Sequence, residues 1–134
     1  MNEEKLSQYL LHKPEAILDY PFGPDVAVYK IHDKLFALVG KERLSPANSN
    51  DRFQLRINLK CDPMEAAQLR DVFDCVIPGY HMNKTHWNTV ILDGSLPDGE
   101  IERMIDNSYA LVVRGLPKKV RLGLQVRHGK QTIE

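Results

Sequence analysis

The sequence has few of the residues on which many specialised sites depend. Its 134 positions hold two cysteines and one tryptophan. Cys61 and Cys75 lack the CxxC spacing of zinc and redox sites, so we expect both to be reduced and structural. No apolar run approaches the roughly 18 residues of a membrane helix, and the acidic start MNEEKLSQYL is unlike a signal peptide. These absences predict a cytoplasmic protein with no membrane contact.

The chain also lacks an excess of charge of either sign. Eighteen basic and eighteen acidic residues give a formal net charge of zero, which argues against a strong non-specific polyanion binder. The distribution is uneven, because six basic residues and one acidic residue lie from Arg114 to the end. This basic segment is either an anion or nucleic-acid contact or, more commonly, a solvated helix face with a frayed tail from about residue 123.

What is present is the composition of a soluble globular protein. Hydrophobic residues make up 43% and charged residues 27% of the chain. The length is enough for a single core and short for two, and there are no repeats or linkers. We therefore expect one domain over residues 1–134 and a monomer.

Hydrophobic periodicity and turn residues predict the elements. Helices are expected over 3–13, 63–73 and 96–116, with another short one near 118–126. Strands are expected at Val26–Ile31, Leu35–Val39, 52–60 and 86–92, and the first two form a hairpin turning at His32, Asp33 and Lys34. Residues 16–26, 41–51 and 75–85 are expected to be surface connections. The predicted class is α+β, an antiparallel sheet packed on one face by helices.

Two elements carry further expectations. The strand RFQLRINLK alternates, so one face is buried while the other presents Arg56 and Lys60 to solvent or to a ligand. Asp62 and then Pro63 begin a helix that should bury an apolar face, namely Met64, Ala67, Leu69, Val72 and Phe73. Either Ser95 or Asp98 should cap the longest helix.

The stretch from Pro78 to Ile101 holds the densest group of reactive residue types. His81, His86 and Asp93 suit a metal, but their spacing spans a loop and a strand, so no metal site is predicted. The nearby hydroxyls have no evident base and orienting partner, and no phosphate-binding glycine loop is present. We therefore expect no enzymatic activity and no cofactor.

The same stretch has two remaining interpretations. Trp87 as a core aromatic, with Asn83 and His86 holding loop carbonyls, is the structural one. The other is a donor-rich patch around Lys84 that suits a phosphate, a carboxylate or a nucleic-acid backbone.

Three segments resemble the MmcQ/YjbR family of small bacterial proteins. They are His81–Ile101, HMNKTHWNTVILDGSLPDGEI, with INLKCDPMEAAQLRD and DKLFALVGK upstream. The resemblance runs from about Lys5 to Leu122, and its matching positions are Lys60, His81, Asn83, Lys84, His86, Trp87, Asp93 and Gly94. It implies a CyaY-like (frataxin-like) α+β fold with a double-wing surface, and DNA binding without enzymatic activity. The segment ERLSPANSNDRF and the tail after Gly123 depart from the pattern.

Two functional hypotheses follow. The first is a DNA-binding module that contacts the nucleic-acid backbone through basic residues, namely Arg56, Lys60, Lys84, Lys118, Lys119 and Arg121. The second is a small-ligand or protein-partner module whose pocket for an anionic or planar group is formed by His81, Asn83, Lys84, His86 and Trp87.

Overall fold

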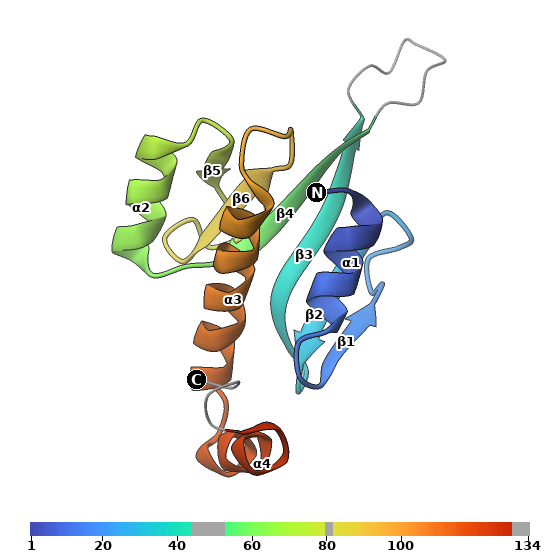
Figure 1. Ribbon diagram of the computed structural model, residues 1–134, viewed down its shortest axis with the longest axis vertical. Helices are drawn as coiled ribbons and strands as arrows, with labels where there is room; N and C mark the ends of the chain where they lie inside the picture. The colour runs from blue at the N-terminus through green and yellow to red at the C-terminus, as the bar shows by residue number, and fades with distance from the viewer. Residues whose placement is uncertain (44–52, 80–81, 130–134) are drawn as a thin grey trace.

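The computed structural model describes residues 1–43, 53–79 and 82–129. Within these ranges the chain forms four helices and six strands (Figure 1). The helices are α1 (Glu3–Leu11), α2 (Pro63–Val72), α3 (Asp98–Arg114) and α4 (Lys118–His128). The strands are β1 (Ala16–Asp19), β2 (Val26–Ile31), β3 (Lys34–Arg43), β4 (Phe53–Lys60), β5 (Val76–Pro78) and β6 (Trp87–Ile91).

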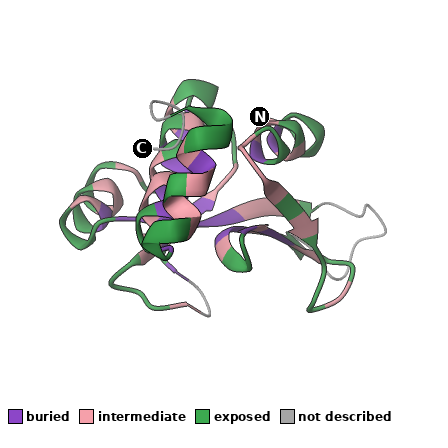
Figure 2. Ribbon diagram, turned by 90° about the horizontal axis from the view of Figure 1, so that it is seen from below, coloured by how far each residue is buried: buried purple, intermediate pink, exposed green. Residues whose placement is uncertain are grey.

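The strands form one antiparallel sheet in the order β1-β2-β3-β4-β6-β5. The helices lie on one side of this sheet, while loops between strands hang below its other side (Figure 2). The predicted α+β class, with an antiparallel sheet packed on one face, is therefore confirmed.

The register of the strands divides the sheet into two faces. Val39, Ile57 and Val90 lie opposite one another in β3, β4 and β6, and all three belong to the buried core under the helices. The neighbouring row, in which Gly40 pairs with Arg56, points the other way because side chains alternate along a strand. We call this second surface the open face.

Helix α3 packs against the middle of the sheet, on β3 and β4. Its Tyr109 ring meets Phe36 edge-on at 5.3 Å between ring centroids, a favourable aromatic arrangement. Buried Ser108 donates its hydroxyl hydrogen to the Phe36 carbonyl at 2.6 Å and accepts from the Lys60 backbone N–H at 2.9 Å. One helix residue thus fixes both β3 and β4.

Two short edge strands were not predicted. Residues 16–19 form β1, which pairs with β2, and residues 76–78 form β5, which pairs with β6. Each is at most four residues long, so neither has enough alternation to reveal a strand. Pairing with a longer neighbour determines them.

The predicted hairpin is confirmed, but its turn and second strand differ. Only His32 and Asp33 form the turn, both with positive φ, whereas Lys34 begins β3. A two-residue turn of this kind matches the twist of its strands. The sequence interpretation ended the strand at Val39, before Gly40, yet β3 continues to Arg43 because β2 and β4 pair with it on both sides.

The start predicted for α2 is confirmed, but its predicted buried face is only partly correct, because Leu69 and Phe73 pack against the core while Ala67 is exposed. Asp62 caps the helix by accepting from the backbone N–H groups of Met64 and Glu65. Met64 and Val72 are, however, 74% and 69% exposed, and Ala66 is the buried residue of the helix. Helix α2 lies at the β5–β6 edge of the sheet.

The caps predicted for α3 are also wrong. The N-cap residue is Pro97, and no side chain caps this end. Ser95 instead hydrogen-bonds the Asp93 carboxylate, which closes the turn at Gly94. Asp98 forms an ion pair with the N-terminal amine at 3.0 Å.

Helix α4 contains residues 118–128 of the basic C-terminal segment. Leu124 anchors it in the core, and Arg127 and His128 both contact the Glu15 carboxylate, each at 2.7 Å at its closest. None of the four described helices is both long and apolar enough to cross a membrane.

Candidate functional site

The open face carries a hollow with a volume of about 880 Å³. Strands β2, β3, β4 and β6 form its floor, and the loop before β2 and the loop before β6 flank it. This size and a mainly apolar lining are typical of ligand sites in proteins. Its lining residues are Phe22, Asp25, Val26, Leu35, Leu38, Gly40, Lys41, Glu42, Arg56, Asn58, Met82 and Thr89.

Gly40 forms the centre of the floor. It pairs with Val26 on one side and Arg56 on the other, in the middle of the sheet. A Cβ built at Gly40 would meet no atom within 4 Å, and its φ is not in the positive range. The backbone therefore does not require glycine here, and the missing side chain leaves open space.

Polar groups gather at the β4 side of the hollow. Arg56 forms an ion pair with Glu42, while its Nε is buried with no hydrogen-bond partner among the described residues. Buried Asn58 accepts a hydrogen bond from the Thr89 hydroxyl through its side-chain oxygen. Its amide NH₂ is then the end available to donate. The hollow thus offers two hydrogen-bond donors, Arg56 Nε and the Asn58 amide, and one acceptor, the Glu42 carboxylate.

The flanking loops add apolar side chains. Phe22 lies in the loop between β1 and β2 and is 70% exposed, which is unusual for so large an apolar residue. Met82 lies in the loop before β6 and is half-buried. An aromatic ring and a flexible thioether therefore border the same hollow.

The loop residues predicted to bind a ligand do not line the hollow. Asn83 accepts from the backbone N–H of Thr85 at 2.9 Å and closes a local turn. Lys84 and His86 are exposed, and the Lys84 carbonyl accepts from Arg70 at 3.2 Å. His81 lies outside the described residues. The structural interpretation suits Asn83 best, because its side chain shapes the loop.

Trp87 begins β6 and pairs with Lys60, which places both on the open face. Gly79 lies so close that a Cβ there would be 2.7 Å from the Trp87 carbonyl oxygen. Its N–H donates to that oxygen at 2.8 Å. Only glycine allows this approach, which sets where β6 begins. Trp87 is half-buried on the open face and is absent from the buried core.

The basic residues predicted to bind nucleic acid fall into two groups. Arg56 and Lys60 lie on the open face, and Lys84 lies in the loop that leads into β6. Helix α4 lies beyond the end of α3 on the helix side of the sheet (Figures 1 and 2). It carries the remaining three, Lys118, Lys119 and Arg121. The structure therefore does not gather all six on one surface.

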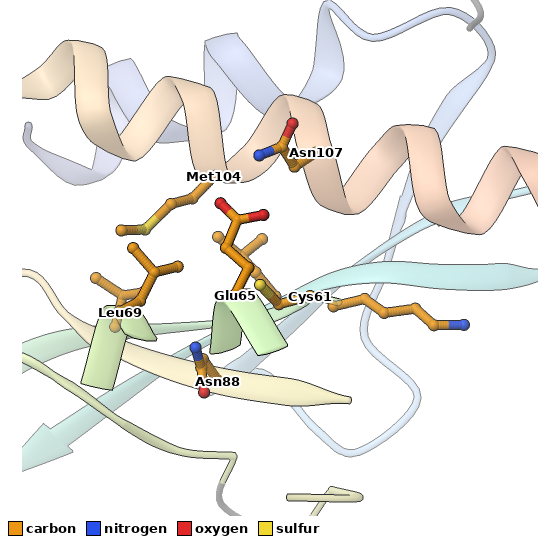
Figure 3. A pocket seen from close by; sticks show the side chains of 9 residues that line it. Cys61, Glu65, Leu69, Asn88, Met104 and Asn107 are labelled. Carbon is orange, nitrogen blue, oxygen red and sulfur yellow. The ribbon is translucent and has the colours of Figure 1, made fainter. Parts of the chain in front are cut away.

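A second, much smaller cavity lies between α2, α3 and the sheet (Figure 3). Its volume of about 10 Å³ suits one water molecule and no ligand. Cys61 lines it, and burial, followed by the charge of Glu65, raises the pKa of its thiol to about 11. A thiol that stays protonated is a poor nucleophile. Cys61 and Cys75 are buried and free, as predicted.

The acidic and histidine side chains that the structure describes do not converge on one point. In the ranges that the structure describes, no three His, Cys, Asp or Glu residues lie close enough to share an ion. Asp93, one of the metal-type residues in the sequence, holds Ser95 instead, and these hydrogen bonds lower the pKa of its carboxyl group.

Sequence reasoning missed the hollow because Gly40 and Phe22, which shape it, have no reactive groups. The strand predicted from the sequence ends at Val39, before Gly40, and Phe22 lies in a predicted surface connection. An isolated glycine inside a strand pattern indicates a place where a ligand or another backbone approaches closely. Arg56 was identified, because the alternation of β4 is clear.

Fold and site together define a small α+β domain with an open, hollowed sheet face. The YjbR family model matches residues 11–111, and the chain belongs to this family. YjbR of Escherichia coli is 37% identical over 121 residues, covering 90% of this chain and 95% of that protein. YbdF of Escherichia coli is 34% identical over 116 residues, with 87% and 88% covered.

Solved structures show the same arrangement. A crystal structure of a Deinococcus radiodurans protein superposes with a TM-score of 0.76 at 30% identity, covering 90% of this chain and 86% of that one. A crystal structure of a Pseudomonas syringae protein gives a TM-score of 0.71 at 34% identity, with 83% and 98% covered. The resemblance found in the sequence is therefore confirmed as family membership.

Proposed function

We propose that the chain is a non-enzymatic, nucleic-acid-binding module that uses the open face of its sheet. The observation that carries the proposal is the hollow at Gly40 and Arg56, with Lys60 further along the same side of β4. Open sheet faces with basic and apolar side chains are a common way to hold nucleic acid strands. The family resemblance, which implies DNA binding, supports the same function.

The charges of this face predict weak binding. Arg56 pairs with Glu42, and Lys30 pairs with Asp19 at 3.3 Å. Lys60 has no ion-pair partner within the described ranges, and the same holds for Lys84 in its loop. Two free ammonium groups contact about two phosphates, so we expect a dissociation constant of about 10–100 µM and a log–log salt slope of about −1.4 for single strands and about −1.8 for duplex.

The test is fluorescence anisotropy of a labelled mixed-sequence DNA, single-stranded and duplex, at two salt concentrations. The variant Lys60→Ala/Lys84→Ala removes both of these ammonium groups. We expect it to weaken binding to all sequences alike and to flatten the salt dependence, since phosphate contacts carry no sequence information.

The matched control is Lys118→Ala/Lys119→Ala, which removes the same charge from exposed positions of α4. We expect binding by this control to stay within about twofold of the unmodified protein, because long-range attraction is screened by salt. If the two double variants weaken binding equally, the open face is not the binding surface. Undetectable binding at low salt would remove the proposal.

A small ligand bound without nucleic acid is the second candidate. The hollow favours it, because about 880 Å³ with a mainly apolar lining matches drug-sized ligands. This site differs from the pocket expected at His81–Trp87, since Met82 is the one described residue of that loop that lines the hollow. Ligand-induced changes at Gly40 that occur without DNA would support it.

A further inference from the structure

We infer that the hollow on the open face receives an unpaired nucleobase, so that the module binds single-stranded nucleic acid in preference to duplex. The inference rests on the proposed function and names the form of nucleic acid that the face recognises. Its basis is the juxtaposition of Gly40, the Arg56–Glu42 pair and Phe22 around one space.

Gly40 provides a flat floor for a planar ring. Glycine in the middle of a strand is unfavourable, since it loses more backbone entropy and packs no side chain. Neither backbone conformation nor crowding requires it at this position, because its φ is not positive and a Cβ would meet nothing within 4 Å. A ligand that lies directly on the backbone at this position explains why residue 40 has no side chain.

The polar groups match the edge of a base. Arg56 Nε is a buried donor without a partner among the described residues, and the Asn58 amide NH₂ is a second donor. The Glu42 carboxylate, already beside Arg56, is an acceptor. A nucleobase carries donors and acceptors together on its edge, whereas a simple carboxylate or phosphate could use only the donors and would be repelled by Glu42 and Asp25.

The apolar groups match the faces of a base. Leu38 and Val26 lie on the floor beside Gly40, and Phe22 extends from the flanking loop with 70% of its surface exposed. Stacking on an aromatic side chain is the usual source of affinity for unpaired bases, and it tolerates any sequence. In a duplex the faces are covered by neighbouring bases, so this hollow has no access to them.

The position of Lys60 favours a strand over a free nucleotide. Lys60 and Arg56 lie four residues apart on the same side of β4, which separates their Cα atoms by about 13 Å. Because of this separation, a phosphate beside Lys60 fits a neighbouring nucleotide better than the nucleotide whose base lies over Gly40. Free thymidine monophosphate should bind much more weakly than an oligonucleotide.

The experiment compares Gly40→Val and Phe22→Ala with the unmodified chain. Valine fills the floor and favours a strand, and the empty space around Gly40 allows the variant to fold. Gly99→Ala is the control, because its Cβ also meets nothing within 4 Å but it lies in α3. The probes are a labelled oligothymidylate, its duplex with oligoadenylate, and free thymidine monophosphate, with thermal unfolding measured for each variant.

We expect both hollow variants to bind the oligothymidylate about fivefold more weakly or worse, with Gly99→Ala unchanged. Normal single-strand binding by folded Gly40→Val would overturn the inference while leaving the proposed function intact. Duplex binding as tight as single-strand binding would do the same. Monophosphate binding that depends on Gly40, without oligonucleotide binding, would support the base site and contradict the proposed function. Failure of every probe at low salt would reject both.

Discussion

Single residues determine how closely neighbouring segments of the sheet can approach, and Gly79 is the strictest case. Its N–H donates to the Trp87 carbonyl at 2.8 Å, and no Cβ fits there. Gly40 is the opposite case, because space around it is open on the ligand side. Gly79 thus allows the chain to pack against itself, whereas Gly40 leaves open space on the face that we propose binds nucleic acid.

Gly79→Ala should destabilise the fold by about 2 kcal/mol, because the new methyl group overlaps backbone atoms of Trp87 that cannot move freely. Urea unfolding would measure the change, with Gly99→Ala as the control that leaves stability equal or higher. If the urea midpoint of Gly79→Ala equals that of the unmodified protein, the claim that only glycine fits beside Trp87 is contradicted.

At the scale of elements, the long patterns of the sequence predicted the fold and the short ones did not. The alternation in β4 and the helical spacing in α3 were enough to place those elements and Arg56 on its correct side. Strands β1 and β5 were missed because pairing, not their own residues, determines them. The hollow was missed because it needs β2, β3, β4 and β6 side by side.

The β2–β3 turn gives a prediction at this scale. Both His32 and Asp33 have positive φ, at 46° and 65°, a conformation that costs energy for residues with a side chain. Asp33→Gly should therefore stabilise the protein by about 0.5–1 kcal/mol. Thermal unfolding measures the gain, and an unchanged or lower midpoint would contradict the type of turn.

At the scale of the molecule, Glu15 joins the C-terminal helix to the beginning of the sheet. Its carboxylate accepts from Arg127 and contacts His32 and His128 at 2.9 and 2.7 Å. The hydrogen bond from Arg127 comes first among the contacts that lower the pKa of Glu15, from its usual 4.5 to about 2. The CyaY-like grouping and the monomeric state stay predictions at this scale.

A lowered carboxyl pKa stabilises the fold above the unfolded-state value, and this stability is lost as pH falls through the folded-state value. The Glu15 contacts should therefore contribute fully above about pH 4.5 and fade toward pH 2. Because these groups are partly exposed, Glu15→Gln should cost about 1 kcal/mol at pH 6 and little at pH 2. Unfolding as a function of pH would show this convergence, and a constant difference would contradict it.

The central claim is that the open face binds nucleic acid, and backbone amide chemical shifts test it most directly. During titration with an oligothymidylate, the amides of Gly40, Arg56 and Asn58 should shift together, while those of Lys118 and Lys119 in α4 should stay in place. Shifts confined to α4, or none at low salt, would contradict the account.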